Sequence, residues 1–573
     1  MVNTQPITRL LSRLWHHISV RRRRQFMLLL VLMLLTSLSE VVGIGAVLPF
    51  LGVLTSPEYI FELPAAQPVI QALNLTEPPQ LLLPFTIAFA VAVLISGAMR
   101  LLLLWASAKL SLATGADLSI SVYRRTLYQP YAVHCARNSS EVITGITTKV
   151  GTAIVIISDV IKIISAGVIL TAILIAMLAV NPVVALVAFS GFGLIYWAII
   201  RLTRSRLLIN SQTTARESTC VIKSLQEGLG GIRDVLIDGL QATYCQIYRN
   251  ADLPLRRVEA NNQFVSGSPR FAMEPLGIIL IIALAYSLAQ QAEGFSKAIP
   301  ILGTIAMGAQ RLLPAMQQAY AAWSSIRASH APLQDALDLL DQPLPDYANQ
   351  PAAQPLPFKH NISLKQLGFR YNTQMPYVIK QLNLTIAKGS RVGFIGITGS
   401  GKSTLLDIVM SLLQPTDGRL EIDGQAVTPD NYRAWQAHIA HVPQAIFLAD
   451  SSIEENIAFG VPKGQIDHER VRQASQQAQI ADSIKSWPEQ YQTFIGERGI
   501  RLSGGQRQRI GIARALYKQA NVIIFDEATS ALDNKTEQAV MQAIEGLSKD
   551  LTLLIIAHRL TTLKNCTQIV ELA

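Results

Sequence analysis

The sequence predicts a helical membrane domain followed by a soluble α/β domain, and three observations lead to this fold class. Half of the 573 residues are hydrophobic, only 15% are charged and the mean hydropathy is +0.31, a balance typical of membrane proteins. Six apolar runs in the first part of the chain are long enough to cross a bilayer. After a proline-rich break, the apolar runs shorten to strand length and alternate with helical patterns.

The long apolar runs define six predicted membrane spans. At about 1.5 Å per residue, each run covers a hydrocarbon core of roughly 30 Å, in some cases with help from flanking residues. The first run follows VRRRRQ and, at 26 residues, is too long for the apolar part of a signal peptide, so we expect it to remain as an anchor. The transmembrane domain is expected to cover residues 1–340, with spans at about 26–51, 81–106, 163–180, 183–200, 271–288 and 298–322.

The distribution of lysine and arginine predicts the orientation of these spans. The loop 55–80 contains neither residue and is expected outside, whereas the N-terminal segment and the segments 109–149 and 201–257 are basic and are expected in the cytoplasm. An even number of spans then places both termini in the cytoplasm. The two internal basic segments are too long for ordinary loops, so we expect the flanking helices to continue beyond the bilayer.

Charge and cysteine content exclude two other kinds of protein. The formal net charge is +10, but the basic residues are concentrated next to apolar runs, where they face lipid head groups rather than nucleic acid. The four cysteines have neither paired spacing nor nearby histidine clusters, so neither a disulfide framework nor a zinc site is expected. Membrane lipid is therefore an expected partner and nucleic acid is not.

A proline-rich segment separates the two predicted domains. Residues 341–357, DQPLPDYANQPAAQPLP, hold five prolines and are expected to be a linker. Beyond it, residues 358–573 contain the short apolar runs RVGFIGI, NVIIFD and LTLLIIAH, which are typical of buried strands in an α/β domain.

A glycine-rich loop follows the first of these strands. RVGFIGITGSGKSTLLDIV contains G-x-x-x-x-G-K-S between a predicted strand and a predicted helix. The glycines let backbone N–H groups close around phosphate oxygens, and the helix N-terminus adds positive potential. Lys402 is expected to reach the β- and γ-phosphates of ATP, and Ser403 to bind Mg²⁺. The predicted phosphate-binding residues are Gly396, Thr398, Gly399, Ser400, Gly401, Lys402, Ser403 and Thr404.

Two carboxylates end the second strand, about 120 residues later. In NVIIFDE, Asp526 is placed to hold the magnesium shell and Glu527 to polarise an attacking water. The alternative is that both acids merely cap a strand. With the glycine loop in the same domain, the pair predicts ATP hydrolysis.

The stretch RLSGGQRQRIGIARAL lies between these two motifs. A serine N-cap followed by glycines leaves free N–H groups at the positive end of a helix, which suits a second anion contact. Here the chain resembles the ABC transporter ATPases, whose signature motif LSGGQ completes the ATP site of the partner subunit. The resemblance assigns this role to Ser503, Gly504, Gly505 and Gln506.

The same resemblance assigns roles to four further residues. It implies that Tyr371 in GFRYN stacks on adenine, that Gln444 in HVPQ serves both catalysis and the metal, that Asp533 in SALD forms the D-loop, and that His558 in IIAHR contacts the γ-phosphate. Taken singly, Tyr371 would more simply be an aromatic residue that packs in the fold. His558 alone would more simply be a histidine whose ring nitrogens are hydrogen-bonded within the fold. Their common order and spacing favour the functional interpretation, and the intact Glu527 and signature imply a homodimer with two competent ATP sites.

Six spans followed by one ATPase domain resemble the type I exporter half-transporters over the full chain. In such proteins, closure of two ATPase domains is passed to the spans through the cytoplasmic extensions. Candidate coupling elements are TLYQPYAVH near Tyr131 and LGGIRDVLIDG near Asp234, although each is equally explained as a solvated helix end. The C-terminus, QIVELA, is expected to be short compared with the family.

Three arginines inside or beside the spans are candidates for binding the cargo. Arg100 lies about 28 Å below the outer end of span two and Arg311 about 20 Å below that of span six, while Arg270 precedes span five. An arginine at such depth pairs with an acid, lines a wet cavity or extends to the head groups, and the last explanation suffices for Arg270 alone. A cationic cavity suits a phosphate-bearing substrate. The alternative is that Glu40 and Glu274 neutralise these arginines structurally.

Several stretches resemble one branch of this family, the lipid-linked oligosaccharide flippases of bacterial N-glycosylation (the PglK type). They are SEVVGIGAVLPFLGVL, EYIFELPAAQPVIQALNL, SPRFAMEPLGI and AMGAQRLLPAMQQAY. The resemblance implies a polyprenyl-pyrophosphate glycan as cargo, moved from the cytoplasmic to the outer leaflet of the bacterial inner membrane. It also implies that the external segment 56–75, a candidate surface helix, contacts the polyprenyl tail.

Two other functions stay open at this point. The same scaffold serves exporters of peptides, drugs or other lipids. A membrane regulatory protein that is gated by ATP without transport is the third hypothesis, and the intact Glu527 weighs against it.

Overall fold

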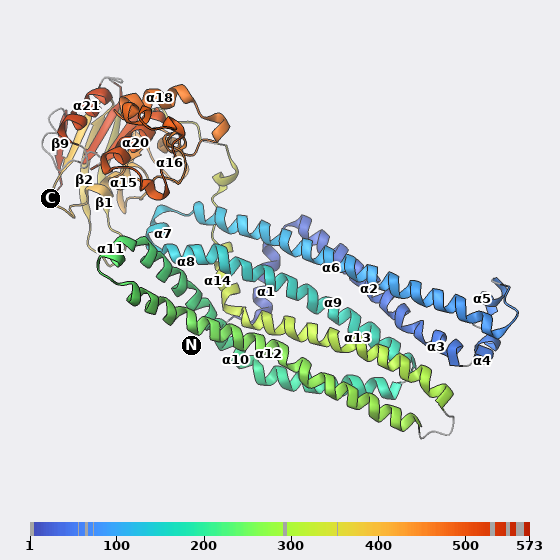
Figure 1. Ribbon diagram of the computed structural model, residues 1–573. Helices are drawn as coiled ribbons and strands as arrows, with labels where there is room; N and C mark the ends of the chain where they lie inside the picture. Colours follow the sequence, from blue (N-terminus) through green and yellow to red (C-terminus); the bar gives the residue numbers. More distant parts are fainter. Residues whose placement is uncertain are drawn as a thin grey trace. The chain divides into compact units, whose positions relative to one another are not determined.

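The protein is described here from a computed structural model, which places all residues except 1–4, 56, 64–66, 73, 181, 290–294, 352, 528–532, 546–549, 557–565 and 573. Its contacts divide the chain into two compact units. The helical unit contains residues 1–129 and 136–345, and the sheet unit contains residues 130–135 and 346–573 (Figure 1). This agrees with the predicted order of a helical domain followed by an α/β domain.

The helical unit consists of long helices joined by short turns. Its helices are α1 (Ile7–His17), α2 (Val20–Gly45), α3 (Val47–Thr55), α4 (Pro57–Glu62), α5 (Gln67–Ala72), η1 (Pro78–Leu81), α6 (Leu82–Leu127), α8 (Ser139–Thr144), the π-helical turn η2 (Gly145–Lys149), α9 (Val150–Val180), α10 (Pro182–Gly230), α11 (Ile232–Ile237), α12 (Gln241–Ala289), α13 (Phe295–Ala328) and α14 (His330–Leu340).

One candidate coupling stretch is divided between the two units, and the other lies in the helical unit. The stretch near Tyr131 forms α7 (Tyr131–Ala136), and residues 130–135 belong to the sheet unit. Asp234 lies in α11 of the helical unit. A coupling role for either stretch remains a prediction.

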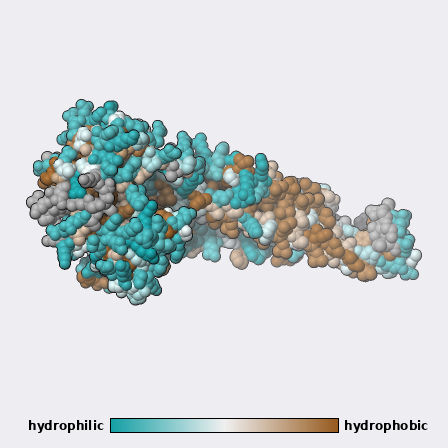
Figure 2. All heavy atoms as spheres, turned by 90° about the horizontal axis from the view of Figure 1, so that it is seen from above, coloured by the Kyte–Doolittle hydropathy of each residue, from teal (hydrophilic) through white to brown (hydrophobic). Residues whose placement is uncertain are grey.

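The long helices cover the predicted spans and continue past them. In the described part of the chain, three stretches are long and apolar enough to cross a bilayer: Val20–Gly43, Pro78–Leu127 and Ser139–Ala179. The remaining predicted spans fall within α10, α12 and α13. Helices α10 and α12 have 49 residues each, roughly 74 Å, against a bilayer core of about 30 Å. Figure 2 shows hydrophobic residues gathered over part of the helical unit.

The first predicted span is not one continuous helix. Helix α2 ends at Gly45 and α3 begins at Val47. Pro49 has no N–H to donate to the carbonyl of Gly45, and its ring crowds that carbonyl. Gly43 and Gly45 also have low helix propensity. The sequence around residue 46 therefore breaks the helix where the apolar pattern alone predicts none.

The segment 56–75, predicted to be external, contains two short helices rather than one. Helices α4 and α5 lie beside α3 and the start of α6, and a small apolar cluster joins them. Its buried members are Val53, Ile70 and Leu81. The segment is therefore anchored to the helical unit by its own apolar contacts.

Two larger cores hold the helical unit together. One lies among α1, α2, α6, α9 and α14, where Leu10, Leu118 and Leu333 are completely or nearly completely buried. The other joins α9, α10, α12 and α13 around Ile173 and Met273. The first core packs the N-terminal helix α1 against the first half of α2.

The sheet unit contains two sheets. Its strands are β1 (Asn361–Phe369), β2 (Ile379–Ala387), β3 (Arg391–Ile395), β4 (Asp417–Ile422), β5 (Gln425–Ala426), β6 (Ile439–Val442), β7 (Val522–Asp526), β8 (Thr552–Ile556) and β9 (Gln568–Glu571). The first sheet is antiparallel with the order β2-β1-β4-β5, and the second is parallel with the order β6-β7-β8-β3-β9. The three strands predicted from apolar runs are β3, β7 and β8.

Helices and turns connect these strands. They are η3 (Asp346–Asn349), α15 (Lys402–Val409), α16 (Tyr432–Gln436), α17 (Ile453–Ile457), η4 (Lys463–Gln465), α18 (His468–Gln477), α19 (Ala481–Lys485), η5 (Gln490–Gln492), η6 (Glu497–Gly499), α20 (Gly504–Tyr517) and α21 (Asn534–Glu545). Because β3 and β7 are parallel and separated only by β8, the loops that follow them emerge at one edge of the sheet. The glycine-rich loop after β3 and the pair Asp526 and Glu527 at the end of β7 therefore lie at the same edge of the sheet.

Candidate nucleotide-binding site

The glycine-rich loop joins β3 to α15 in a conformation that requires glycine. Gly396, Gly399 and Gly401 have φ angles of 145°, 90° and 88°, in the region that L side chains avoid. A Cβ atom on Gly396 would also lie 2.3 Å from the carbonyl oxygen of Leu572. The loop can therefore keep this path only with glycine at these positions.

Two polar side chains of the loop are arranged for an anion. The Lys402 ammonium donates hydrogen bonds of 2.8 Å to the carbonyl oxygens of Gly396 and Ile397, so its charge stays at the loop. The Ser400 hydroxyl is buried and has no hydrogen-bond partner among the described residues. A buried hydroxyl without a partner costs free energy, and a phosphate oxygen would remove that cost. The loop thus fits the phosphates of a nucleotide.

A hydroxyl and a carboxylate meet beside this loop. The Ser403 hydroxyl, in the first turn of α15, lies near enough to the Asp526 carboxylate at the end of β7 to lower the pKa of that group. Burial raises the pKa of Asp526, and the negative charge of Glu527 acts in the same direction. Hydroxyl and carboxylate oxygens are ligands that Mg²⁺ prefers, so Ser403 and Asp526 fit a magnesium ion.

A third carboxylate, Asp407, lies near Asp526, and the sequence analysis missed it. Burial raises the pKa of Asp407 to about 6, and the negative charge of Asp526 adds to the shift. Asp407 is four residues after Ser403 on α15, which places both side chains on one face of the helix. That spacing was the available signal. We refer to Asp407, Asp526 and Glu527 as the carboxylate cluster.

Glu527 and Gln444 come together from two adjacent strands. The Gln444 side-chain amide donates a hydrogen bond of 2.8 Å to the Glu527 carboxylate. Gln444 follows β6 and Glu527 follows β7, and these strands pair directly. Glu527 has a φ angle of 51°, a conformation that is rare and costly outside glycine and that is often found at functional sites.

Tyr371 has an exposed aromatic ring beside α15, the helix that follows the glycine loop. Its side chain is 57% exposed, and its hydroxyl lies 3.0 Å from the Thr404 hydroxyl. The ring contacts Phe369 edge to face, with 5.0 Å between the ring centroids. The free face of an anchored ring is suited to stacking on a planar base.

The signature residues form the start of helix α20. Ser503 is the N-cap of α20: its hydroxyl accepts a hydrogen bond from the backbone N–H of Gln506, and the Gln506 side chain accepts one from the N–H of Ser503. Gly504 and Gly505 follow in the first turn. Within the described ranges, no hydrogen bond joins these residues to the glycine loop. Their role in the site of a second copy remains a prediction.

For Asp533 and His558, the two remaining predicted ATP-site residues, the structure gives less information about a role in nucleotide binding. The Asp533 carboxylate accepts hydrogen bonds from the backbone and hydroxyl of Thr536, and these bonds lower the pKa of Asp533. It therefore stabilises the start of α21. His558 lies outside the described residues.

Two of the three candidate cargo arginines are paired with acids. The Arg100 guanidinium lies 3.1 Å from the Glu40 carboxylate, whose side chain is only 5% exposed. Arg270 lies 2.7 Å from Glu274, one helical turn further along α12. These pairs support the alternative in which the glutamates neutralise the arginines. For Arg311 the structure records no ion pair among the residues it places.

Comparison with known proteins identifies the family. Residues 379–530 match the family described as ABC transporter. An ATP-dependent lipid A-core flippase from Cupriavidus pinatubonensis is 40% identical over 215 residues, which is 37% of this chain and 36% of that protein. A protein of the same name from Thiobacillus denitrificans is 32% identical over 393 residues, 68% of this chain and 66% of that protein. The chain thus spans between about a third and two thirds of the length of these relatives.

A solved structure extends the similarity to the whole fold. A bacterial Atm1-family ABC exporter with ATP bound superimposes with a TM-score of 0.78, covering 96% of this chain and 93% of that one, at 23% sequence identity. The chain therefore belongs to the ABC transporters. It has the fold of a type I exporter half-transporter, with one helical transmembrane domain followed by one ATPase domain. The predicted family resemblance is confirmed at this level.

Proposed function

We propose that this protein binds and hydrolyses ATP and uses the energy to flip a lipid-linked pyrophosphate glycan across the bacterial inner membrane. The observation that carries the ATPase proposal is the meeting of the glycine loop and the carboxylate cluster at one edge of the parallel sheet. Relatives named lipid A-core flippase support an amphipathic lipid as cargo. Both termini are placed in the cytoplasm in this proposal.

Residues of this chain account for each part of ATP hydrolysis. The N–H groups of the glycine loop and the Lys402 ammonium hold the phosphates, while Ser403 and Asp526 hold Mg²⁺, with Gln444 as a further ligand. When bound, Mg²⁺ neutralises negative charge on the phosphate oxygens. Glu527 polarises the attacking water, and the hydrogen bond from Gln444 holds the Glu527 carboxylate in place.

Completion of the site requires a second copy of the chain in this proposal. The helix start at Ser503 offers N–H groups at the positive end of α20, and anions bind well there. As the resemblance to the ABC transporter ATPases implies, the second copy in a homodimer supplies this helix start in trans.

Arg311 is the favoured cargo-binding residue in this proposal. The ion pairs of Arg100 and Arg270 compensate their charges within the chain. Arg311 is partly buried on α13. A guanidinium group binds phosphate oxygens in pairs, which suits a pyrophosphate.

The experiment is ATP-dependent translocation of fluorescent lipids between leaflets of proteoliposomes. The panel contains a polyprenyl pyrophosphate glycan, the same glycan lipid without the pyrophosphate, and a phosphatidylcholine. Faster movement of the pyrophosphate lipid, lost in Glu527→Gln, is the expected result. Equal movement of all three lipids would instead favour a general exporter of drugs, peptides or other lipids. ATP hydrolysis without movement of any cargo would favour the regulatory alternative.

A further inference from the structure

We propose that a groove between α1, α2 and α9 binds one acyl chain of an anionic phospholipid, whose phosphate is held by Arg21 and Arg24. This site goes beyond the proposed function, because the lipid is a resident of the membrane and not the transported cargo. The groove, the charges at its edge and the position of α2 each support the assignment.

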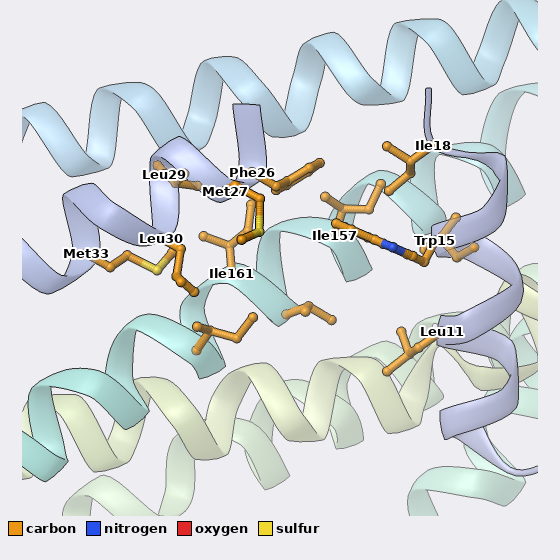
Figure 3. A pocket seen from close by; sticks show the side chains of 13 residues that line it. Leu11, Trp15, Ile18, Phe26, Met27, Leu29, Leu30, Met33, Ile157 and Ile161 are labelled. Atoms are coloured by element: carbon orange, nitrogen blue, oxygen red, sulfur yellow. The ribbon is translucent and has the colours of Figure 1, made fainter. Parts of the chain in front are cut away.

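The groove is a cavity of about 190 Å³ with an almost entirely apolar lining (Figure 3). Helix α1 contributes Leu11 and Trp15, α2 contributes Phe26 and Met33, and α9 contributes Ile161, among 13 lining residues. An apolar cavity of about 150 Å³ stays dry and holds a molecule the size of benzene. The groove is therefore large enough for a segment of an acyl chain and too apolar for a polar ligand.

Four consecutive arginines begin α2, and two of them have structural partners. Arg22 forms an ion pair of 2.8 Å with Asp117 on α6. The Arg23 guanidinium donates hydrogen bonds of 2.9 Å to the carbonyl oxygens of Trp15 and His16, and so closes the C-terminal end of α1. These two arginines therefore join α2 to α6 and to α1.

The other two arginines are available for a ligand. Arg21 and Arg24 are exposed and have no ion pair among the described residues. Arg24 precedes the groove residue Met27 by three positions, and Arg21 precedes Arg24 by three, so each of these side chains is next to the following one on the surface of α2. A phosphate between the two guanidinium groups would therefore stand one turn of helix from the groove.

The charges around the groove favour an anionic head group over a zwitterionic one. Residues 7–33 contain no aspartate or glutamate, and the one acid in residues 150–164, Asp159, lies 2.8 Å from Lys162. Helix α2 is apolar enough to cross a membrane from Val20 to Gly43, so its basic first turn is at head-group level. The groove lies further along α2, on the hydrocarbon side of this turn, where the acyl chains of a lipid are found.

Photolabelling of the full-length protein tests this site. The protein is placed in phosphatidylcholine nanodiscs without ATP, together with phosphatidylglycerol that carries a photoreactive group in its acyl chain. We expect labelling to concentrate on the peptides 11–33 and 157–164 relative to the stretch 101–105 of α6, in which every residue except Leu103 is exposed. Unlabelled phosphatidylglycerol should compete, and Arg21→Ala with Arg24→Ala should lower its preference over phosphatidylcholine roughly tenfold.

Two further variants separate the groove from general lipid contact. Leu30→Trp fills the groove from α2 and should remove the labelling there while the 101–105 stretch keeps its own. Arg249→Ala, which removes an exposed arginine elsewhere on the helical unit, should change nothing. Labelling spread evenly over the apolar helices, equal competition by phosphatidylcholine, or cross-links between two copies of the chain would each overturn the proposal. None of these results depends on ATP hydrolysis or on the cargo, so a failure here is distinct from a failure of the proposed function.

Discussion

Charges are arranged differently in the two units of the chain. In the sheet unit, burial raises the pKa values of Asp407 and Asp526, and the negative charges of Asp526 and Glu527, respectively, add to these shifts. In the helical unit, Arg100 and Arg270 each face a glutamate. Like charges side by side are unfavourable unless a counter-charge joins them, whereas opposite charges satisfy one another. The carboxylates of the sheet unit thus lie in an unfavourable electrostatic environment, whereas the two arginines of the helical unit are compensated within the chain.

The largest expected effect is at the centre of the carboxylate cluster. Glu527→Gln should lower ATP hydrolysis by roughly 10²- to 10⁴-fold, because the amide cannot accept the proton of the attacking water. ATP binding, measured with a fluorescent nucleotide, should persist. Glu469→Gln, an exposed acid on α18, is the control and should hydrolyse at the wild-type rate. Hydrolysis by Glu527→Gln close to that of the control would show that another residue polarises the water.

The second largest expected effect is a loss of ATP affinity when the glycine loop is changed. Gly396→Ala would place a Cβ atom 2.3 Å from the carbonyl oxygen of Leu572 and force a φ of 145° on alanine. The strain is about 1–3 kcal/mol, so we expect ATP affinity to fall about 10- to 100-fold. Gly464→Ala, where the new methyl group meets open space, is the matched control. Unchanged affinity in Gly396→Ala would mean that the loop adopts another path.

The Arg100–Glu40 pair tests the other side of the comparison. Arg100→Gln leaves the buried Glu40 carboxylate without its partner and should destabilise the protein by about 1–2 kcal/mol, less than for a fully buried pair because the arginine is 43% exposed. Glu40→Gln combined with Arg100→Gln should recover most of the loss in thermal unfolding. A stable double variant that no longer flips lipid would instead assign Arg100 to the cargo site.

The smallest effect is a pH dependence of stability from Asp407. Its pKa is raised to about 6 in the folded protein, so the folded state binds the proton more tightly than the unfolded state does. Stability from this group is therefore present at pH 4 and is lost as the pH rises through about 6. Asp407→Asn should melt like the wild type at pH 4 and about 2–4 °C higher at pH 7.5, for a gain of about 1 kcal/mol after allowing for partial exposure. A lower melting temperature at pH 7.5 would refute the assignment, and Asp430→Asn serves as an exposed control.

Structural features that depend on the local order of residues could be predicted from the sequence. The glycine loop lies between a strand and a helix within 19 residues, so its fold and its chemistry could be predicted together. Asp407 was missed because its relation to Asp526 depends on how α15 packs against β7, which the local pattern does not contain. The break at Ala46 was missed because the apolar run hides the effect of Pro49. For Arg100, the sequence left cargo binding and pairing open, and only the contact between α2 and α6 favours pairing.

The central claim is that a charge without compensation marks a ligand site, and Arg311 tests it most directly. The measurement is the ATP-dependent translocation rate of a polyprenyl-pyrophosphate glycan in proteoliposomes, for the wild type, Arg311→Ala, Arg270→Ala and the double variant Arg100→Ala with Arg311→Ala. We expect Arg311→Ala and the double variant to lose translocation while basal ATP hydrolysis continues, and Arg270→Ala to retain both. Undiminished translocation in the double variant would contradict the account.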